Sequence, residues 1–353
     1  MIFSRIFSWF HENGEISNGS SSSFIALIPK VKDPVSLGNF RPISLVGVIS
    51  KVISKVIANR FRKVLDGVIS NSQSAFLSGR YILDGPLIVN ELITWVKKRK
   101  DRAFLFKIDF EKAFDNVRWS FVVNVLHQMG FPSTWVKWIS GILKSARSSV
   151  LVNGATTFQF RCEKGMRQGD PLSPFLFLVV MEALSRMLSR AKEAGIIKGI
   201  PTPNNGPVIS HLLYADDAIV LGEWCREELG NVLRILRCFF LCSGLKINLD
   251  KSSLFGIGVN SDDTKEMAFE FGCKPDSLPF IYLGLKVGAN MNRISNWQPV
   301  YEAFRSRLSS WKGHLLSIGG RVVLIKSVLE SLPSFYFSLY KAPKKVIGLG
   351  EDD

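Results

Sequence analysis

The sequence has no apolar run long enough to span a membrane and no cysteine spacing typical of a metal site. Its longest apolar run, residues 175–181, is far shorter than the roughly 20 residues of a spanning helix. The five cysteines form no CxxC pair, and Cys238 and Cys242, four apart on a helical pattern, are expected to be packed thiols rather than ligands. The apolar start carries Arg5 and no small-residue cleavage site. We therefore expect an intracellular chain, nuclear or cytoplasmic, with no membrane partner.

Acidic residues are scarce relative to basic ones. The 353 residues include 45 Lys and Arg against 30 Asp and Glu, a formal net charge of +15. A surface of this sign attracts polyanions, and of the two kinds of partner that this charge allows, nucleic acid is preferred to an anionic membrane surface. The hydrophobic share of 46% is that of a globular protein, and the length predicts about two domains.

Two adjacent acids lie between two mostly apolar stretches. Residues 210–213 lead into Tyr214–Asp217 and residues 218–221 follow, which predicts a β-hairpin with Asp216 and Asp217 at its tip. An ordinary acidic turn is one explanation, because Asp tolerates tight turns. Two neighbouring carboxylates repel each other unless a cation lies between them, so the pattern also predicts a divalent metal and a third acid elsewhere.

Asp109 is the best third acid. Residues 103–110 alternate, which predicts a strand whose phenylalanines and Ile108 face the core while Leu105, Lys107 and Asp109 face the other way. A carboxylate at the end of this strand would meet the hairpin acids if the two strands were neighbours.

Three further segments have distinctive patterns. Residues 52–68 predict an amphipathic helix with cations on its outer face, either a solvated face or one that contacts phosphates. The loop 165–174 contains two glycines and the donors Arg167 and Gln168 before a helix expected over 175–194; it is either a plain helix entry or a ligand-binding loop. Asn153-Gly154 predicts a hairpin between its flanking strands.

Seven motifs in a fixed order resemble the reverse transcriptase domain of LINE-type (non-LTR) retrotransposons, and the plant members most closely. They are LIPK at 27–30, FRPISL at 40–45, DFEKAFD at 109–115, QGDPLSP at 168–174, YADD at 214–217, GLKIN at 244–248 with Lys251, and YLG at 282–284. The resemblance covers about residues 10–343. Each motif alone is weak, but seven in the order of the family are specific.

The resemblance implies an α+β fold, the right-hand polymerase with fingers, palm and thumb. The palm is expected to combine an antiparallel sheet with helices, and the thumb to be helical and partial. The implied divisions are a lead-in over 1–23, fingers over 24–100, a palm with fingers elements over 101–290, a partial thumb over 291–343, and an unstructured end over 344–353.

The resemblance also implies RNA-directed DNA polymerase activity with an RNA template, a DNA primer and dNTPs. Asp109, Asp216 and Asp217 would be catalytic and, with the Phe110 carbonyl, would bind two Mg²⁺ ions, with Mn²⁺ as the alternative. This assignment agrees with the chemistry of the residues, because in-line attack of a primer hydroxyl on an α-phosphate uses two such ions and Mg²⁺ prefers carboxylate oxygens.

The other implied roles concern the substrates. Phe114 would exclude the 2′-hydroxyl of a ribonucleotide, Gln168 and Gly169 would belong to the nucleotide pocket, and Arg41 and Lys51 would contact the triphosphate. Lys251 would protonate pyrophosphate, and Tyr282, Leu283 and Gly284 would form the primer grip. The plainer alternatives are that Phe114 is a core aromatic residue and that Lys51 and Lys251 are solvated surface charges.

Some parts expected of a full element are absent from this sequence. An endonuclease region usually precedes the domain, and in plants a ribonuclease H or zinc-knuckle region often follows it. A catalytically silent remnant that only binds nucleic acid is therefore the alternative function. A viral RNA-dependent RNA polymerase and a group II intron maturase fit less well, because Phe114 would oppose ribonucleotides and no maturase-like region follows.

Overall fold

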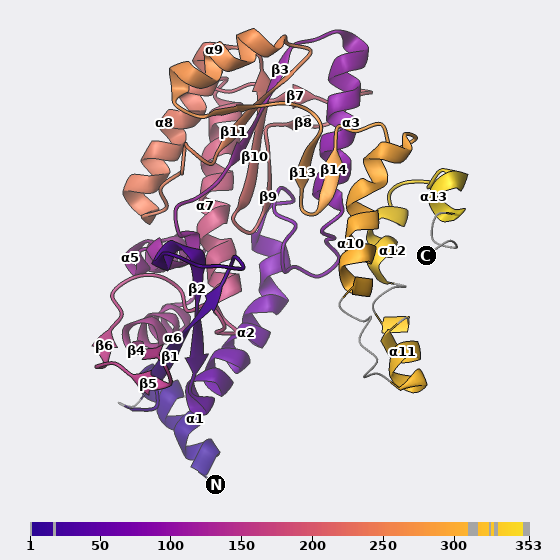
Figure 1. Cartoon of the computed structure of the whole chain (residues 1–353). Coiled ribbons are helices and arrows are strands. Elements are labelled where there is room, and N and C mark those ends of the chain that lie inside the picture. The colour runs from indigo at the N-terminus through magenta and orange to yellow at the C-terminus, as the bar shows by residue number, and fades with distance from the viewer. Residues whose placement is uncertain (1, 17–18, 310–316, 325, 328–330, 349–353) are drawn as a thin grey trace. The chain divides into compact units, whose positions relative to one another are not determined.

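The chain divides into two compact units, which are described separately. The computed structural model describes residues 2–16, 19–309, 317–324, 326–327 and 331–348. The first unit contains Met1–Tyr81 and Asp101–Asp276, and the second contains Ile82–Lys100 and Ser277–Asp353 (Figure 1). The predicted mixed α+β class is confirmed, since both units combine helices with strands. In the described ranges, no helix is both long and apolar enough to cross a membrane.

A five-stranded sheet forms the centre of the first unit (Figure 1). Its strand order is β12 (Lys274–Asp276), β11 (Ser253–Ile257), β3 (Ala103–Ile108), β10 (Asp217–Glu223) and β9 (His211–Tyr214). The β3 strand pairs antiparallel with both of its neighbours, β10 and β11. The sequence predicted β3 as a strand with Leu105 on the face opposite to its phenylalanines, but it did not predict that Leu105 would be completely buried. As the central strand, β3 is covered on both faces, and Leu105 is buried outside the main core cluster that contains Phe104 and Phe106.

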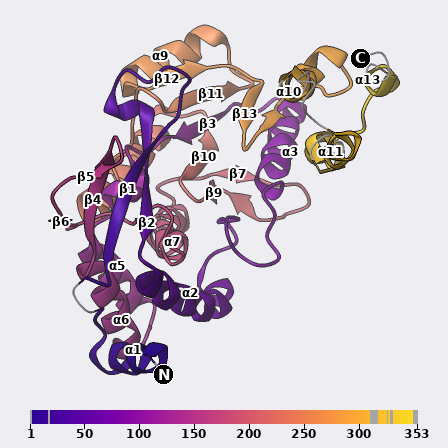
Figure 2. The same ribbon diagram turned by 60° about the horizontal axis from the view of Figure 1, so that its bottom comes forward.

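A second sheet lies in the same unit and contains a long hairpin (Figure 2). Its strands are β1 (Ser22–Pro29), β2 (Phe40–Val46), β4 (Arg147–Val152), β5 (Ala155–Thr156) and β6 (Phe160–Arg161). The β1 strand pairs antiparallel with β2 and parallel with β4. The hairpin predicted at Asn153-Gly154 is confirmed, because both residues have positive φ and join β4 to β5.

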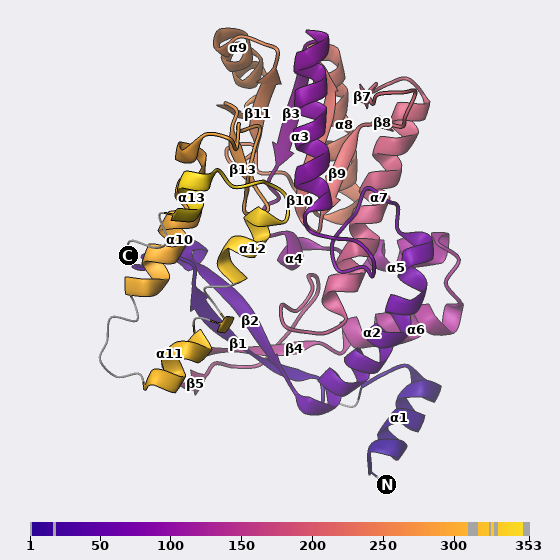
Figure 3. The ribbon, with the colours of Figure 1, turned by 90° about the vertical axis from the view of Figure 1, so that its right-hand side faces the viewer.

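Helices of the first unit cover these sheets and each other. They are α1 (Ile2–Asn13), α2 (Val48–Val68), α4 (Ala113–Asn116), α5 (Trp119–Gln128), α6 (Ser133–Lys144), α7 (Ser173–Glu193), α8 (Arg226–Ser243) and α9 (Ser261–Phe271). The α1 helix packs against α6, where the Trp138 indole donates to the His11 carbonyl at 3.0 Å (Figure 3). The short elements are η1 (Leu37–Asn39), β7 (Ile200–Pro201) and β8 (Val208–Ile209).

The helix patterns mostly predicted burial correctly. In α2 the predicted apolar stripe is buried at Ile53, Ile57, Phe61 and Leu65, whereas Val56 and Val64 are exposed. The cations predicted on its outer face are exposed: Lys51, Lys55, Arg60, Arg62 and Lys63. Cys238 and Cys242 were expected to be packed, and this is wrong: both are exposed on α8. The helix buries the neighbouring Leu236 and Phe239 instead, so the two cysteines lie outside its buried stripe.

The second unit is small and has its own core. It contains α3 (Asp84–Arg99), β13 (Phe280–Tyr282), β14 (Leu285–Val287), η2 (Ile294–Trp297), α10 (Gln298–Ser309), α11 (Ile318–Leu324), α12 (Ser331–Phe337) and α13 (Lys344–Gly348). Its core includes Leu285, Trp297 and Tyr336. The unstructured end expected over 344–353 is wrong for its first part, because α13 buries Val346 in this core. Residues 349–353 lie outside the described residues.

A buried polar network lies where α7 meets β9. The Nε2 atom of His211 lies 2.8 Å from the Ser185 hydroxyl, and its Nδ1 atom lies 3.0 Å from the Ser210 hydroxyl. Ser185 also contacts Ser70, whose hydroxyl donates to the buried Glu182 carboxylate. Burial and, to a smaller extent, the charge of Lys192 lower the pKa of His211 from 6.5 to about 4. His211 is therefore neutral in the folded protein at neutral pH.

This network predicts a loss of stability in mild acid. Below about pH 6.5 the unfolded chain binds a proton on His211 that the folded chain takes up only near pH 4, so stability falls across this window. The full loss is about 3 kcal/mol, from about 1.4 kcal/mol per pKa unit. The measurement is the free energy of unfolding in denaturant at pH 7.5, 5.5 and 4.5, for wild type and for His211→Gln. The contribution of His211 is the difference between the two proteins in how this free energy changes with pH. The exposed His127→Gln is the control, and an equal pH dependence in wild type and His211→Gln would contradict the expectation.

Candidate active site

The acidic hairpin predicted from the sequence is formed by β9 and β10. Tyr214 pairs with Asp217, so Ala215 and Asp216 form a two-residue turn between the strands. Ala215 is buried and has φ +52°, a left-handed conformation that costs an ordinary residue about 1 kcal/mol. Asp216 and Asp217 are exposed at the tip.

The sheet register brings Asp109 beside this tip. Ile108 at the end of β3 pairs with Ala218 of β10, and the next pair in an antiparallel register is Asp109 and Asp217. Partial burial raises the pKa of Asp109, as does the charge of Asp216, while Lys251 lowers it. Partial burial of its carboxyl group likewise raises the pKa of Asp217, and the charges of Asp216 and Asp109 add to the effect. The three carboxylates therefore lie close enough to repel one another.

The fit of this group to a divalent metal follows from its chemistry. Its donors are carboxylate oxygens, which Mg²⁺ and Mn²⁺ accept, and a cation would relieve their mutual repulsion. Within the part of the chain that the structure describes, no three His, Cys, Asp or Glu side chains are gathered closely enough to hold an ion together. The pairing of their strands thus makes the three acids neighbours, but among the described residues their side chains do not converge on one point as metal ligands would.

The segment that follows α8 runs along the residues around Asp109. The Asn248 amide donates to the Asp109 carbonyl at 2.7 Å, and the Glu111 amide donates to the Lys246 carbonyl at 2.8 Å. The Asp109 amide donates to the Ser252 hydroxyl at 3.0 Å. These bonds bring the exposed Lys251 near the Asp109 carboxylate, as its effect on that pKa shows. Phe110, predicted to offer its carbonyl to a metal, directly follows Asp109, pairs with Ile247 of this segment and has a buried side chain.

The loop that contains Gln168 contacts the residues around Phe114. The Met166 amide donates to the Phe114 carbonyl at 2.7 Å, which attaches the glycine-containing loop to the residues around α4. The half-buried Phe114 ring stacks on Phe177, with ring centroids 4.5 Å apart. Burial raises the pKa of Asp115, and a hydrogen bond from the Gln168 side chain opposes this shift. Asp115 and Gln168 both line a cavity of about 130 Å³.

The loop is also paired to β2, which explains Gly169. The Ser44 amide donates to the Gln168 carbonyl at 2.7 Å. Gly169 has φ +105°, and a Cβ atom there would lie 2.9 Å from the Ser44 carbonyl oxygen. A side chain at this position would therefore be both strained and obstructed.

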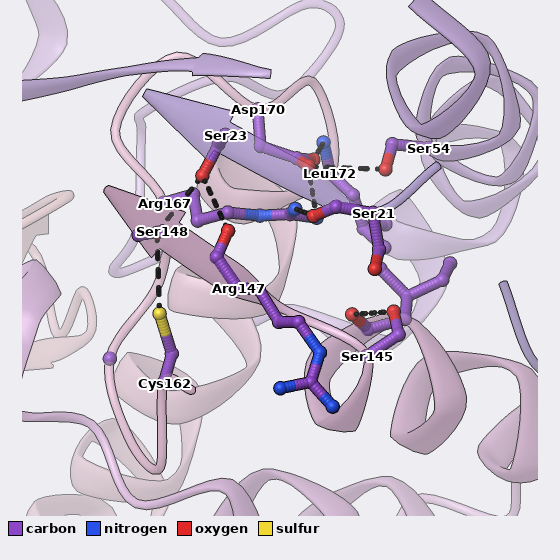
Figure 4. Close-up of polar contacts among 12 residues, drawn as sticks. Ser21, Ser23, Ser54, Ser145, Arg147, Ser148, Cys162, Arg167, Asp170 and Leu172 are labelled. Carbon is purple, nitrogen blue, oxygen red and sulfur yellow. Dashed lines mark hydrogen bonds and ion pairs between the residues drawn. The ribbon is translucent and has the colours of Figure 1, made fainter. Parts of the chain in front are cut away.

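A buried ion pair fixes the other half of the loop (Figure 4). Asp170 accepts hydrogen bonds from Arg167 at 2.8 Å, from the Ser54 hydroxyl at 3.1 Å and from the Leu172 amide at 2.9 Å. Ser54 belongs to α2, so the pair connects the loop to that helix. Asp170 and Asp115 were not predicted as site residues from the sequence. The position of Asp170, directly before Pro171 and just ahead of a long helix, was the feature of the sequence that could have identified it.

The remaining predicted residues lie elsewhere. Arg41 is exposed on β2, and Lys51 is exposed in the first turn of α2. Tyr282 is buried in the second unit, and the turn between β13 and β14 contains Leu283 and Gly284, both with positive φ. The primer-grip residues thus belong to the second unit, whereas the acids belong to the first. Their assigned roles stay predictions.

The fold and the acidic hairpin define the class of protein. Residues 28–287 match the family described as reverse transcriptase (RNA-dependent DNA polymerase), and the chain belongs to this family. More narrowly, it is a reverse transcriptase domain similar to those of non-LTR retrotransposons.

Its relatives include proteins of several transposable elements. The chain is 28% identical over 335 residues to the uncharacterized 149 kDa protein of transposon TX1 from Xenopus laevis, covering 93% of this chain and 25% of that protein. It is 25% identical to the Pol polyprotein of retrotransposable element R2DM from Drosophila melanogaster, over 84% of this chain and 26% of the relative. The chain thus spans about a quarter of these relatives. A telomerase structure from Candida tropicalis, 12% identical and solved with a fragment of telomeric RNA, shares the fold with a TM-score of 0.53 over 96% of this chain and 57% of that chain.

Proposed function

We propose that this chain is an RNA-directed DNA polymerase that transfers nucleotides from dNTPs to the 3′-hydroxyl of a DNA primer on an RNA template. The observation that carries the proposal is the register that puts Asp109 opposite Asp217 and beside Asp216. Because the chain belongs to the reverse transcriptase family, we assign nucleotidyl transfer to this group of three acids. A short match to an uncharacterized mitochondrial protein of Arabidopsis thaliana, 49% identical over 67 residues, supports a plant element as the source.

The proposed mechanism assigns work to residues that the fold brings together. Asp109, Asp216 and Asp217, with the Phe110 carbonyl, would hold two Mg²⁺ or Mn²⁺ ions, which lower the pKa of the attacking hydroxyl and neutralise the leaving pyrophosphate when bound. Lys251 lies near Asp109, where it can donate a proton to the leaving group.

The nucleotide pocket is proposed at the cavity beside Asp115 and Gln168. Phe114, held by its stack on Phe177, would close the space that a 2′-hydroxyl needs. The exposed cations of α2, Lys51 among them, and Arg41 of β2 offer favourable charge to phosphates. We propose that nucleic acid is the polyanion that the net charge of +15 attracts, which suits a nuclear or cytoplasmic chain.

Primer extension with the full 353-residue chain tests the function. We expect incorporation of dNTPs on a DNA primer annealed to RNA, dependent on Mg²⁺ and strongly preferred over NTPs. The measurement is product length on a denaturing gel with each nucleotide set. Binding of the primer–template that weakens steeply with salt, without any incorporation, would support the silent remnant instead. Preference for NTPs would favour an RNA polymerase.

A further inference from the structure

A loop after α2 extends the central sheet beyond β9. The Leu213 amide donates to the Ser72 carbonyl at 2.7 Å, and the Ser74 amide donates to the Leu213 carbonyl at 3.0 Å. Residues 72–74 thereby form a short parallel bridge with the strand that leads into the acidic turn. The loop lies far from this turn in sequence but beside it in the sheet.

Gln73 is the residue of this loop that contacts the turn itself. Its side chain is completely buried, and its Oε1 atom accepts the Ala215 amide at 2.9 Å and the Ala75 amide at 3.0 Å. Ala215 is the left-handed residue of the turn, directly before Asp216. The Gln73 oxygen therefore holds its own loop, through Ala75, and also the Ala215 peptide, which precedes Asp216 in the acidic turn. Both hydrogen bonds to the backbone are made by the oxygen of this amide.

The surrounding contacts hold Gln73 in place. The Arg80 guanidinium donates to the carbonyls of Ile69, Ser70 and Gln73. The buried Glu182 carboxylate accepts the Ser70 amide at 2.9 Å and the Ser70 hydroxyl at 2.8 Å. Because both ends of the loop are anchored in this way, the position of the Gln73 oxygen is set before any substrate binds.

We propose that Gln73 is a positioning residue of the active site, which holds the Ala215 peptide so that Asp216 and Asp217 lie correctly beside Asp109. The proposal rests on the proposed function. Catalytic groups must be held within about 0.5 Å and 10–20° of their working geometry. Losing the acceptor for the Ala215 amide frees a turn whose conformation is intrinsically unfavourable for alanine, and the two carboxylates move with it. The residue touches no reacting atom and acts through the turn.

The test compares Gln73→Met, which keeps the shape and removes the acceptor, with Gln73→Glu. A glutamic acid at a fully buried position takes up a proton and keeps a carbonyl acceptor for the two amides. We expect Gln73→Met to lower kcat about 10- to 100-fold with little change in the KM for dNTP. The Mg²⁺ concentration for half-maximal rate and the Kd for Mn²⁺ alone, measured by electron spin resonance, should each rise about tenfold. Gln73→Glu should keep most of the wild-type values.

The controls separate positioning from stability. Val125→Ala removes buried volume from α5 and should lower the melting temperature without changing Mn²⁺ affinity. If Gln73→Met does not fold, Gln73→Asn keeps an amide whose oxygen is one methylene too short for Ala215, and it should weaken Mn²⁺ binding in the same way.

The two proposals can fail separately. A wild-type chain that extends no primer but binds Mn²⁺, with weaker binding in Gln73→Met, would defeat the polymerase function and support the positioning role. Equal Mn²⁺ affinity in wild type and Gln73→Met would overturn the positioning role, as would an equal effect of Val125→Ala. A wild-type chain that binds no Mn²⁺ at all would overturn it as well.

Discussion

Asp216→Asn is expected to abolish primer extension on an RNA template, with a fall in rate of at least about a thousandfold. The substitution keeps the size of the side chain but removes one of the three charges that a divalent ion would balance. Asp216 is exposed at the tip of the turn and is not part of the core, so the fold should be retained. The measurement is the rate of incorporation of a single dNTP, with binding of the primer–template measured in parallel.

Asp262→Asn is the matched control for this substitution. Asp262 is 91% exposed in the first turn of α9 and pairs with Lys265, so its loss should leave extension unchanged. Extension that survives Asp216→Asn would disprove the assignment of the acidic turn as the catalytic centre. If Asp216→Asn lost both primer–template binding and extension, the result would instead point to a folding defect.

Phe114→Val is expected to raise the use of NTPs relative to dNTPs by about a hundredfold. The phenylalanine ring is half-buried and stacked on Phe177, which fixes its position, and valine would leave the space of the missing ring open to a 2′-hydroxyl. The change should also cost about 1–2 kcal/mol of stability through the lost packing. The measurement is the ratio of kcat/KM for one NTP and its matching dNTP.

Phe177→Leu separates selectivity from packing. Phe177 is completely buried on α7 and forms the other half of the stack, so its substitution removes comparable packing and leaves the Phe114 ring in place. We expect it to lower stability with a much smaller change in the NTP to dNTP ratio. Equal ratios in the two variants would show that Phe114 acts as a core aromatic residue.

Much of the local structure was predictable from the sequence. Apolar runs on both sides of Tyr214–Asp217 predicted the β9–β10 hairpin, and the spacing of apolar residues predicted α2. The apolar run that begins at residue 175 predicted the long helix α7. Such patterns are reliable because side-chain periodicity is dictated by the backbone geometry of a strand or helix. They also identified Asp109 as the third acid, conditional on its strand being a neighbour of the hairpin.

The same patterns could not predict which surfaces would be covered. Leu105 alternates with the core residues of β3 and is nevertheless buried, because a central strand can be covered on both faces. Cys238 and Cys242 lie on a helical pattern with apolar neighbours and are nevertheless exposed, because Leu236 and Phe239 occupy the buried stripe of α8. Periodicity describes one element at a time, whereas burial depends on what packs against it.

By itself, the sequence determined the acidic hairpin, the helices that flank it and the ordered motifs that mark the reverse transcriptase family. Only the tertiary structure decided that β3 lies between β10 and β11, which brings Asp109 to Asp217 across more than a hundred residues of chain. It alone showed that Gln73 supports Ala215 and that Asp170 pairs with Arg167. The reason is physical: hydrogen-bond and strand partners are chosen by the packing of distant segments, and no local pattern records that choice.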